Sequence, residues 1–478
     1  MIDLHDDVYI GGRWRRSKSE RRSPVFNPAT GEIWANVPDG NTEDIDNAVA
    51  AARSAFPGWA ATPPEERAGM LRALADQIDA RSDALSACIT TENGTPISET
   101  RSAPGYGAAH LREVASLAHL LTEEDKRSNP LSSGSSLVRR HPLGVAGLIT
   151  PWNFPLGLII VKLGPALLAG CTVVLKPAPE TPMAARMLME AIEATGFPPG
   201  VVNMVTGSTE AGSALVEHPG VDKISFTGST DVGRMIGASC GRLLRPATLE
   251  LGGKSPAIVL DDVDTSVLAA NILKVSMRNT GQTCKACTRL LLPAHRHDEL
   301  LELVADVVSS APLGDPFNPA TFFGPLVSER QRQRVLGYME IGAAEGAKAV
   351  VGGGLPAGLQ RGFYVEPTVF RDVTPGMRIA QEEIFGPVLA VIPYSDVDEA
   401  VAIANDSPFG LAATVFGADL DRARSVADRL DTGNVGINHY GSNAAAPFSG
   451  HKASGLGTEF GPEGLSQYLT YTSIHFPS

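Results

Sequence analysis

The stretch that decides the fold runs from residue 145 to residue 226. Four short apolar runs recur in it: VAGLI (145–149), TVVL (172–175), VVNMV (201–205) and KISF (223–226). Apolar runs of this length without polar alternation are typical of strands that are buried on both faces. Longer stretches with helical spacing, such as residues 182–195, lie between them. The alternation predicts a parallel sheet covered by helices.

A second run of the same kind follows the first. PAIVL (256–260) precedes a predicted helix at 264–278 and the strand TRLLL (288–292), and the pattern repeats beyond residue 360. Before both runs, apolar spacings of three and four predict helices at 43–56 and from Pro64 to Ile78. Because 478 residues exceed what one core supports, we expect an α/β fold with two or three domains.

Two segments outside these runs also have the alternation of strands. SNPLSSGSSLVRR (128–140) reads as a Ser- and Gly-rich turn that enters a strand, and LSQYLTYTSIHF (465–476) alternates in the same way. Such strands lie either at simple sheet edges or in contact with another subunit, and the sequence leaves both alternatives open.

The composition favours small-molecule chemistry in a reducing compartment. A formal net charge of −13 leaves no basic surface for a nucleic acid. Five cysteines do not suit a disulfide framework, and the acidic start MIDLHDDVYIGGRW is not typical of a signal peptide, so a cytoplasmic location is predicted. The uncharged segment 144–161 is long enough for a membrane span. Pro151 and Pro155 would break its helix, so we expect a buried strand that runs into a loop, and no membrane partner.

The segment GQTCKACTR (281–289) carries the most informative cysteine. Small polar residues flank Cys284, which favours an accessible thiol on a turn, whereas Cys88, Cys171 and Cys240 lie among apolar residues and are predicted to be packed. Cys284 and Cys287 form a C-x-x-C pair, which leaves a redox dithiol open. No second pair and no nearby histidines complete a ligand set, so no metal site is predicted.

Three further segments contain candidate functional groups. Glu250, in LELGGKSP (249–256), lies among apolar residues, where burial would raise its pKa and suit it to act as a base. Asn153, in ITPWNFP (149–155), is held between aromatic and proline residues and could donate to a developing oxyanion. The glycine-rich fingerprint of dinucleotide-binding domains is absent, but FTGSTDVG (226–233) joins a strand to a helix that starts near Asp231, so its amides and the Ser229 hydroxyl would face an anion.

In this order, the segments closely resemble the aldehyde dehydrogenase superfamily over essentially the whole chain. The matching segments are YIGGRW, ITPWNFP, VLKPAPETP, FTGSTDVG, LELGGKSP, GQTCKACTR, EEIFGPV and PFSGHKASGLG. The resemblance implies a Rossmann-like cofactor domain (1–123 and 143–252), a second α/β catalytic domain (253–450) and a small β flap for oligomerisation (124–142 and 451–478). It also implies a homodimer or homotetramer.

The resemblance further implies a role for each site residue. Cys284 would be the nucleophile, Asn153 with the backbone amide of Cys284 would hold the oxyanion, Glu250 would activate water, and Lys162 would relay protons. Lys176 would bond the adenosine ribose, Ser229 the pyrophosphate and Glu383 the nicotinamide ribose, beside Phe385. The remaining implied cofactor contacts are Ile149, Thr150, Pro151, Trp152, Pro179, Gly228 and Leu251.

Departures from the family pattern bear on specificity. Many NAD-preferring members have Glu three residues after the ribose-binding lysine, where this chain has Pro179, followed by Glu180. NAD is favoured and NADP stays an alternative. The implied substrate pocket contains Phe154, Leu158, Val161, Thr283, Tyr440 and Phe448. Val161 replaces an aromatic residue of the betaine-aldehyde members, so we expect an apolar aldehyde (aliphatic, terpenoid or aromatic) rather than a cationic one.

Three alternative functions are weighed against hydrolytic oxidation. A CoA-acylating semialdehyde dehydrogenase would pass the thioester to a thiol, and such members resemble this chain less because they lack the base at Glu250. A non-catalytic protein on the same fold would not need Cys284, Asn153 and Glu250. A redox-sensing protein would use Cys284 and Cys287.

Overall fold

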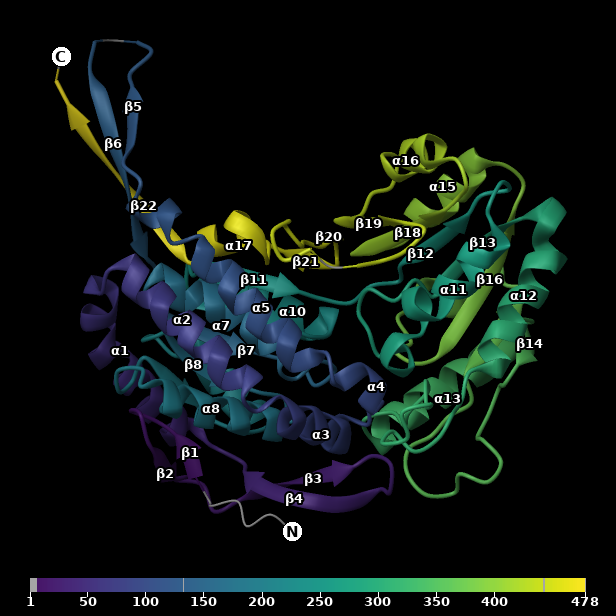
Figure 1. Cartoon of the computed structure of the whole chain (residues 1–478), viewed down its shortest axis with the longest axis horizontal. Helices are drawn as coiled ribbons and strands as arrows, with labels where there is room; N and C mark the ends of the chain where they lie inside the picture. Colours follow the sequence, from purple (N-terminus) through teal and green to yellow (C-terminus); the bar gives the residue numbers. More distant parts are fainter. Residues whose placement is uncertain (1–6, 132, 442, 478) are drawn as a thin grey trace.

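The computed structural model describes residues 7–131, 133–441 and 443–477. The parts of the predicted segments that fall on residues 1–6, 132, 442 and 478 lie outside the described residues. Figure 1 shows two halves, each built around a sheet, and a narrow third sheet that projects from the first half and carries the C-terminus.

The first half contains an eight-stranded sheet with the four predicted strands at its centre. In spatial order its strands are β2 (Trp14–Arg16), β1 (Asp7–Tyr9), β9 (Val202–Met204), β8 (Thr172–Lys176), β7 (Val145–Ile149), β10 (Lys223–Thr227), β11 (Ala247–Glu250) and β21 (Gly455–Leu456). The strands from β9 to β11 run parallel, and β1 and β21 pair antiparallel at the two sides. The predicted parallel sheet is therefore confirmed.

Alternate residues of β7 enter two different apolar cores. Leu148 packs in a core with α2, α5 and α7, while Val145 and Ile149 pack in another with α1 and α9. This burial on both faces explains why VAGLI shows no polar alternation. The helices of this half are α1 (Thr42–Ala61), α2 (Pro64–Asp79), α3 (Ser82–Asn93), α4 (Ile97–Thr100), α5 (Ala103–Ser116), α6 (His119–Thr122), α7 (Gly157–Ala169), α8 (Met183–Thr195), α9 (Thr209–Glu217), α10 (Thr230–Arg242) and α17 (Gly461–Ser466).

The order of the strands reverses beside β7. The next two strands along the chain, β8 and β9, lie on one side of β7, whereas β10 and β11 lie on the other. Ligands of open parallel sheets bind at the carboxyl ends of the strands beside such a reversal. Ile149 ends β7 and Thr227 ends β10, so the loops at 150–156 and 228–229 meet at this edge.

The second half has a seven-stranded sheet, which confirms the second α/β unit. Its spatial order is β14 (Lys348–Val351), β15 (Thr368–Arg371), β16 (Val388–Tyr394), β13 (Arg289–Pro293), β12 (Pro256–Val259), β18 (Ala412–Phe416) and β19 (Asn434–Ile437), with only β14 antiparallel among the described pairs. Its helices are α11 (Thr265–Ser276), α12 (His297–Ser310), α13 (Glu329–Ala344), α14 (Arg378–Gln381), α15 (Val397–Asn405) and α16 (Leu420–Ala427), with 3₁₀ turns at Arg278–Gly281 and Ala294–Arg296.

The projecting sheet joins the two segments with alternating patterns. β22 (Leu469–Phe476) pairs antiparallel with β6 (Ser135–Pro142), which pairs with β5 (Asp125–Ser128). The predicted strand at 465–476 starts only at residue 469, because 461–466 form α17 and pack on α7. Residues 455–456 pair with β11, so this part of 451–478 belongs with the first sheet. Two antiparallel two-stranded pairs complete the described fold: the hairpin of β3 (Arg22–Asn27) and β4 (Glu32–Pro38), and β17 (Phe409–Gly410) with the later strand β20 (His451–Lys452).

The uncharged segment 144–161 forms β7, a loop and the start of α7, as predicted. Pro151 and Pro155 both lie in the loop. Over the described ranges, every helix is too short or too polar to cross a membrane.

Candidate active site at two cavities that share a cysteine

The predicted cofactor residues gather at the carboxyl edge of the first sheet. Ile149 pairs with Lys176 at the ends of β7 and β8, and Thr227 pairs with Glu250 at the ends of β10 and β11. The sheet therefore brings together residues that are up to 101 positions apart in the sequence, from 149 to 250.

A first cavity of about 420 Å³ opens above this edge. Seven of the predicted cofactor residues line it: Pro151, Trp152, Gly228, Ser229, Leu251, Glu383 and Phe385. The other four, Ile149, Thr150, Lys176 and Pro179, are not among its lining residues and lie at or after the ends of β7 and β8. The rings of Trp152 and Phe385 meet edge to face, with centroids 5.2 Å apart, and join the two halves.

The first cavity has the features of an anion site at one side. Gly228 and Ser229 line it and lead directly into α10, which has 13 residues. Ser229 is the N-cap, and its hydroxyl accepts a hydrogen bond from the Val232 amide at 3.4 Å. The free amides and the dipole at the start of a helix favour a phosphate group there.

Lys176 is held by backbone carbonyls beside this edge. Its ammonium donates to Pro177 O at 3.0 Å and to Gly207 O at 2.8 Å. Burial lowers the pKa of Lys176 to about 8, against the opposing effect of Glu180 and Asp39. Glu180, which follows Pro179, forms an ion pair with Arg330 at 3.1 Å.

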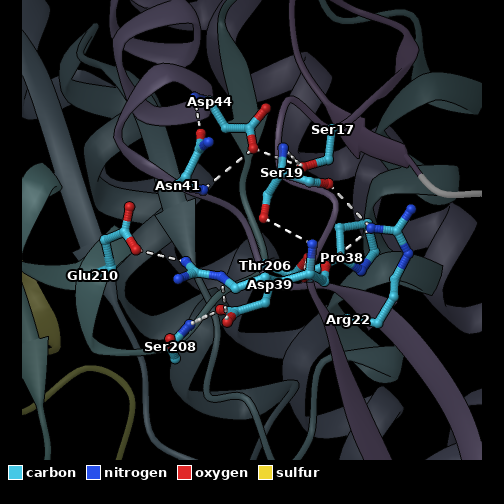
Figure 2. A network of polar contacts seen from close by, with 11 residues as sticks. Ser17, Ser19, Arg22, Pro38, Asp39, Asn41, Asp44, Thr206, Ser208 and Glu210 are labelled. Atoms are coloured by element: carbon cyan, nitrogen blue, oxygen red, sulfur yellow. Dashed lines mark hydrogen bonds and ion pairs between the residues drawn. The ribbon is translucent and has the colours of Figure 1, made fainter.

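A polar network fixes the loop that contains Gly207, as Figure 2 shows. Asp39 accepts from the Ser208 amide at 2.8 Å, and Thr206 donates its hydroxyl to Pro38 O at 2.7 Å. Arg21 pairs with Glu210 at 2.5 Å, at the start of α9. The N-terminal segment therefore positions the carbonyl that binds Lys176.

A second cavity of about 380 Å³ lies on the other side of the cysteine. The two cavities share three lining residues, Asn153, Thr227 and Cys284. Five of the predicted pocket residues line the second cavity: Phe154, Leu158, Val161, Thr283 and Phe448. Tyr440 is not among them, and the Lys285 ammonium lies 4.0 Å from the centroid of its ring.

Cys284 is the cysteine that reaches the cavities, in a turn before β13, as predicted. The other four cysteines are buried thiols: Cys88, Cys171, Cys240 and Cys287. Burial raises the pKa of Cys284 to about 12, and the charge of Glu383 adds to this effect while Lys285 opposes it. Cys287 packs in an apolar core and contacts the Thr414 hydroxyl at 3.6 Å, which does not favour the redox dithiol.

Asn153 is held with one amide hydrogen already used. Its Nδ2 donates to Gln282 O at 3.0 Å, and its side chain is 3% exposed. An amide nitrogen carries two hydrogens, so the second remains to be donated into the space that both cavities share.

The loop before Cys284 has a strained backbone. Asn279 and Thr280 have φ of 51° and 55°, and Gly281 has φ of 73°. A left-handed conformation is rare for a β-branched residue and costs about 1–3 kcal/mol. At Gly281, a Cβ would lie 2.1 Å from Gly386 O, so only glycine fits.

Glu250 lines the second cavity, and the acid Glu459 and the base Lys162 lie beside it. Both of its carboxyl oxygens are buried and have no hydrogen-bond partner among the described residues. Burial raises the pKa of Glu250 well above its usual range, Glu459 adds to the rise, and Lys162 opposes it. Lys162, fully buried, forms an ion pair with Glu459.

Several residues of the site were missed at the level of sequence. Glu459 was missed although it lies in the segment after PFSGHKASGLG, because nothing local marks it as the partner of Lys162. Gln331 and Arg334 of α13 line the first cavity and donate to Phe385 O at 2.8 Å and to Glu383 O. Their polar helix reads as an ordinary solvated one. Thr227 was not predicted as a site residue, because it ends the strand KISFT.

Metal-binding groups do not gather in the part of the chain that the structure describes. Across the described ranges, no group of three or more His, Cys, Asp or Glu side chains could hold a metal ion.

Comparison with known proteins places the same segments in one family. The model of the Aldehyde dehydrogenase family matches residues 14–474. Geranial dehydrogenase of Castellaniella defragrans is 48% identical over 474 residues, which cover 98% of each chain. Among solved structures, a mutant of aldehyde dehydrogenase C from Pseudomonas syringae in complex with NAD+ and octanal is 42% identical, with a TM-score of 0.95 over 99% of this chain and 98% of that one. The Mycobacterium tuberculosis aldehyde dehydrogenase complexed with NAD+ is 43% identical, with the same TM-score and coverage.

The pKa of Cys284 predicts how the thiol reacts in the unliganded protein. Because a pKa of about 12 lies above the working range, the thiolate fraction rises with pH, and alkylation by iodoacetamide should accelerate about tenfold per unit between about pH 6 and pH 9. The C284A variant is the control, because any alkylation that it still shows comes from the four buried thiols. A rate that levels off below about pH 8 would contradict the raised pKa.

Proposed function

The chain belongs to the aldehyde dehydrogenase family, and we propose that it oxidises an apolar aldehyde to the carboxylic acid with NAD, through a covalent bond to Cys284. The observation that carries this proposal is the meeting of two cavities at Cys284 and Asn153. One cavity suits a dinucleotide, because a helix N-terminus lies beside it, and the other is mainly apolar.

The first cavity fits a nicotinamide cofactor. Ser229 and the start of α10 would bind its pyrophosphate, Lys176 the adenosine ribose and Glu383 the other ribose. The two solved relatives described above are complexes with NAD+. When bound, the nicotinamide supplies the acceptor for the hydride that leaves the substrate carbon. NAD is favoured over NADP because Glu180 and Asp39 place negative charge near Lys176.

The first step of the chemistry is set by charge. The charge of Glu250 adds to the rise in the pKa of Cys284, so one negative charge is tolerated in this buried space more easily than two. The thiol gives its proton to solvent water in the cavity as sulfur bonds to the carbonyl carbon. The carbonyl oxygen then becomes an oxyanion, which accepts from the second amide hydrogen of Asn153 and from the backbone amide of Cys284.

Loss of hydride from the substrate carbon leaves a thioester on Cys284, and hydrolysis of this thioester requires a base. Ionised Glu250 takes a proton from water, the water oxygen bonds to the acyl carbon, and the carbon–sulfur bond breaks to return the thiolate. The buried ion pair of Lys162 and Glu459 lies beside Glu250 and can pass that proton on. The presence of Glu250 in the cavity does not favour transfer to coenzyme A.

The walls of the second cavity favour an apolar substrate. Ile89, Phe154, Leu158, Val161 and Phe448 line it. The Arg278 guanidinium already lies over the Phe154 ring, 5.4 Å from its centroid, so this face does not remain for a cationic substrate. Geranial and octanal, which the names of two relatives contain, are apolar aldehydes.

The domains divide these tasks. We assign cofactor binding to residues 1–123 and 143–252, and the nucleophile to 253–450. The five cysteines are free thiols, which fits a cytoplasmic location.

Two substitutions test the covalent mechanism. C284A should form no reduced nicotinamide with any aldehyde, because no acyl-enzyme can form. E250Q should keep a first burst near one equivalent per active site, while its steady-state rate falls at least about a hundredfold, since only water activation is lost. Stopped-flow absorbance of reduced nicotinamide measures both.

E302Q, on the exposed side of α12, is the matched control for loss of a carboxylate. Undiminished turnover by C284A would contradict the nucleophile. Recovery of E250Q by coenzyme A would instead indicate an acyl-transferring enzyme.

A substrate panel tests the apolar cavity. Octanal, citral and benzaldehyde should give higher kcat/KM values than a trimethylammonium aldehyde, because the Arg278 guanidinium already lies over the Phe154 ring and Val161 offers a cation no ring. Initial rates with NAD and with NADP rank the aldehydes and the two cofactors together. The highest kcat/KM for the cationic aldehyde would make the substrate proposal wrong.

We also propose that the chain forms a homodimer or homotetramer. Apolar side chains remain exposed beside α10 and β21: Met235 is 63%, Leu244 92% and Leu456 58% exposed. Together with the projecting sheet of β5, β6 and β22, this surface would be covered by a second copy.

Substitution of Leu244 tests the association. L244D should shift the protein toward a smaller species in size-exclusion chromatography with light scattering, because a charge would enter the contact. Leu244 has φ of 52°, which aspartate tolerates well, so its fold should persist. L420D, on α16 where Leu420 is 60% exposed, is the control. The proposal would be wrong if the protein without any substitution were a monomer.

A further inference from the structure

Two buried amides outside the proposed chemistry hold the loop that contains Asn153. Asn93 Nδ2 donates to Trp152 O at 2.6 Å, and Asn279 Nδ2 donates to Asn153 O at 2.9 Å. Two successive carbonyls of the loop are therefore bound by residues that lie 186 positions apart, from 93 to 279. Both asparagine side chains are at most 1% exposed.

One hydroxyl lies against the oxygens of both amides. Thr95 Oγ1 donates to Asn279 Oδ1 at 2.7 Å and also contacts Asn93 Oδ1. A backbone carbonyl only accepts, so the amide nitrogens must face the loop and the amide oxygens must face Thr95. The one hydroxyl hydrogen, donated to Asn279 Oδ1, favours this orientation of the Asn279 amide, because a flipped amide would place its oxygen against the carbonyl oxygen of the loop.

The same asparagine closes a ring of hydrogen bonds on the side chain of Asn153. Asn279 O accepts from the Gln282 amide at 3.0 Å and from Gln282 Nε2 at 3.2 Å. Gln282 O in turn accepts from Asn153 Nδ2 at 3.0 Å. The side chain of Asn279 thus holds the backbone of Asn153. Gln282, which is bound to Asn279 O, holds the side chain of Asn153.

This ring fixes the direction of the one amide hydrogen that Asn153 has left. Gln282 lies two residues before Cys284, so the ring also ties that hydrogen to the position of the thiol. The left-handed φ of 51° at Asn279 presents its carbonyl to Gln282 and its side chain to Asn153 at the same time.

We propose that Thr95 and Asn279 are positioning residues for the oxyanion amide of Asn153, a proposal that rests on the proposed function of Asn153. Thr95 sets the orientation of the Asn279 amide, and Asn279 sets the direction in which Asn153 donates. Their effect should appear in the formation of the acyl-enzyme rather than in the binding of the aldehyde.

The isosteric substitution T95V removes the hydroxyl and tests the proposal. In single-turnover experiments with octanal and NAD, we expect the burst of reduced nicotinamide to slow by about tenfold to a hundredfold, with the KM for octanal little changed. T95S restores the hydroxyl and should recover most of the rate. The alkylation rate of Cys284 should not change, because the thiol itself is untouched.

The matched control is T91V. The Thr91 hydroxyl donates to Ala87 O within its own helix, at 2.8 Å, so its removal should leave the burst unchanged. If T95V does not fold, N279D replaces it, because aspartate tolerates the left-handed backbone but has no hydrogen to donate to Asn153 O. The same slower burst is expected.

A double-mutant cycle separates positioning from a merely structural role. In an N153A background, T95V should slow the burst no further, because the group it orients is gone. An equal loss in both backgrounds, an unchanged burst in T95V, or a T95S burst as slow as that of T95V would each overturn the proposal. A normal burst in N153A alone would overturn the oxyanion role of Asn153, and this positioning role with it.

Discussion

The site depends on the cost of placing negative charge in a buried space. Burial raises the pKa of Cys284 to about 12 and that of Glu383 to about 7, and it raises the pKa of Glu250 well above its usual range. Each of these side chains therefore keeps its proton to a higher pH than usual. A negative charge on one of them also disfavours a negative charge on its neighbour. Lys285 and the buried Lys162 compensate part of this cost. The thiol can thus be kept unreactive until a positive or hydrogen-bonding group stabilises its charge.

The geometry around that charge is held by polar bonds rather than by apolar packing. The backbone at Asn279 and Thr280 is left-handed, which is unfavourable in isolation. The bonds that keep it there are buried, and they involve Gln282, whose Oε1 accepts from the Val327 amide at 3.0 Å. In a dry interior, such bonds are strong when all groups are satisfied and costly when one is lost. The strain and the bonds together give the cysteine loop one conformation.

Much of the fold could be predicted from sequence because its strands are buried on both faces. VAGLI and KISF are continuous apolar runs, and they became neighbouring central strands. The strand β5 has the sequence DKRS and no apolar signal, so it was missed, and only its pairing with β6 reveals it. The reactive residues carry local motifs, but their partners do not. Glu459 and Arg334 read as ordinary surface residues, because their roles follow from tertiary contacts with Lys162 and Glu383 that no local pattern encodes.

The reactive groups are divided between the two halves of the molecule. Asn153 and Glu250 belong to the first sheet and its loops, while Cys284 and Glu383 follow strands and helices of the second half. Neither half alone can complete the reaction, so the contact between them is itself part of the site. That contact includes the edge-to-face pair of Trp152 and Phe385 and the bond from Asn153 to Gln282 O. Because the amide that we propose for the oxyanion bonds from one half to the other, the halves must be docked before this amide can point at the thiol, and docking therefore precedes reactivity.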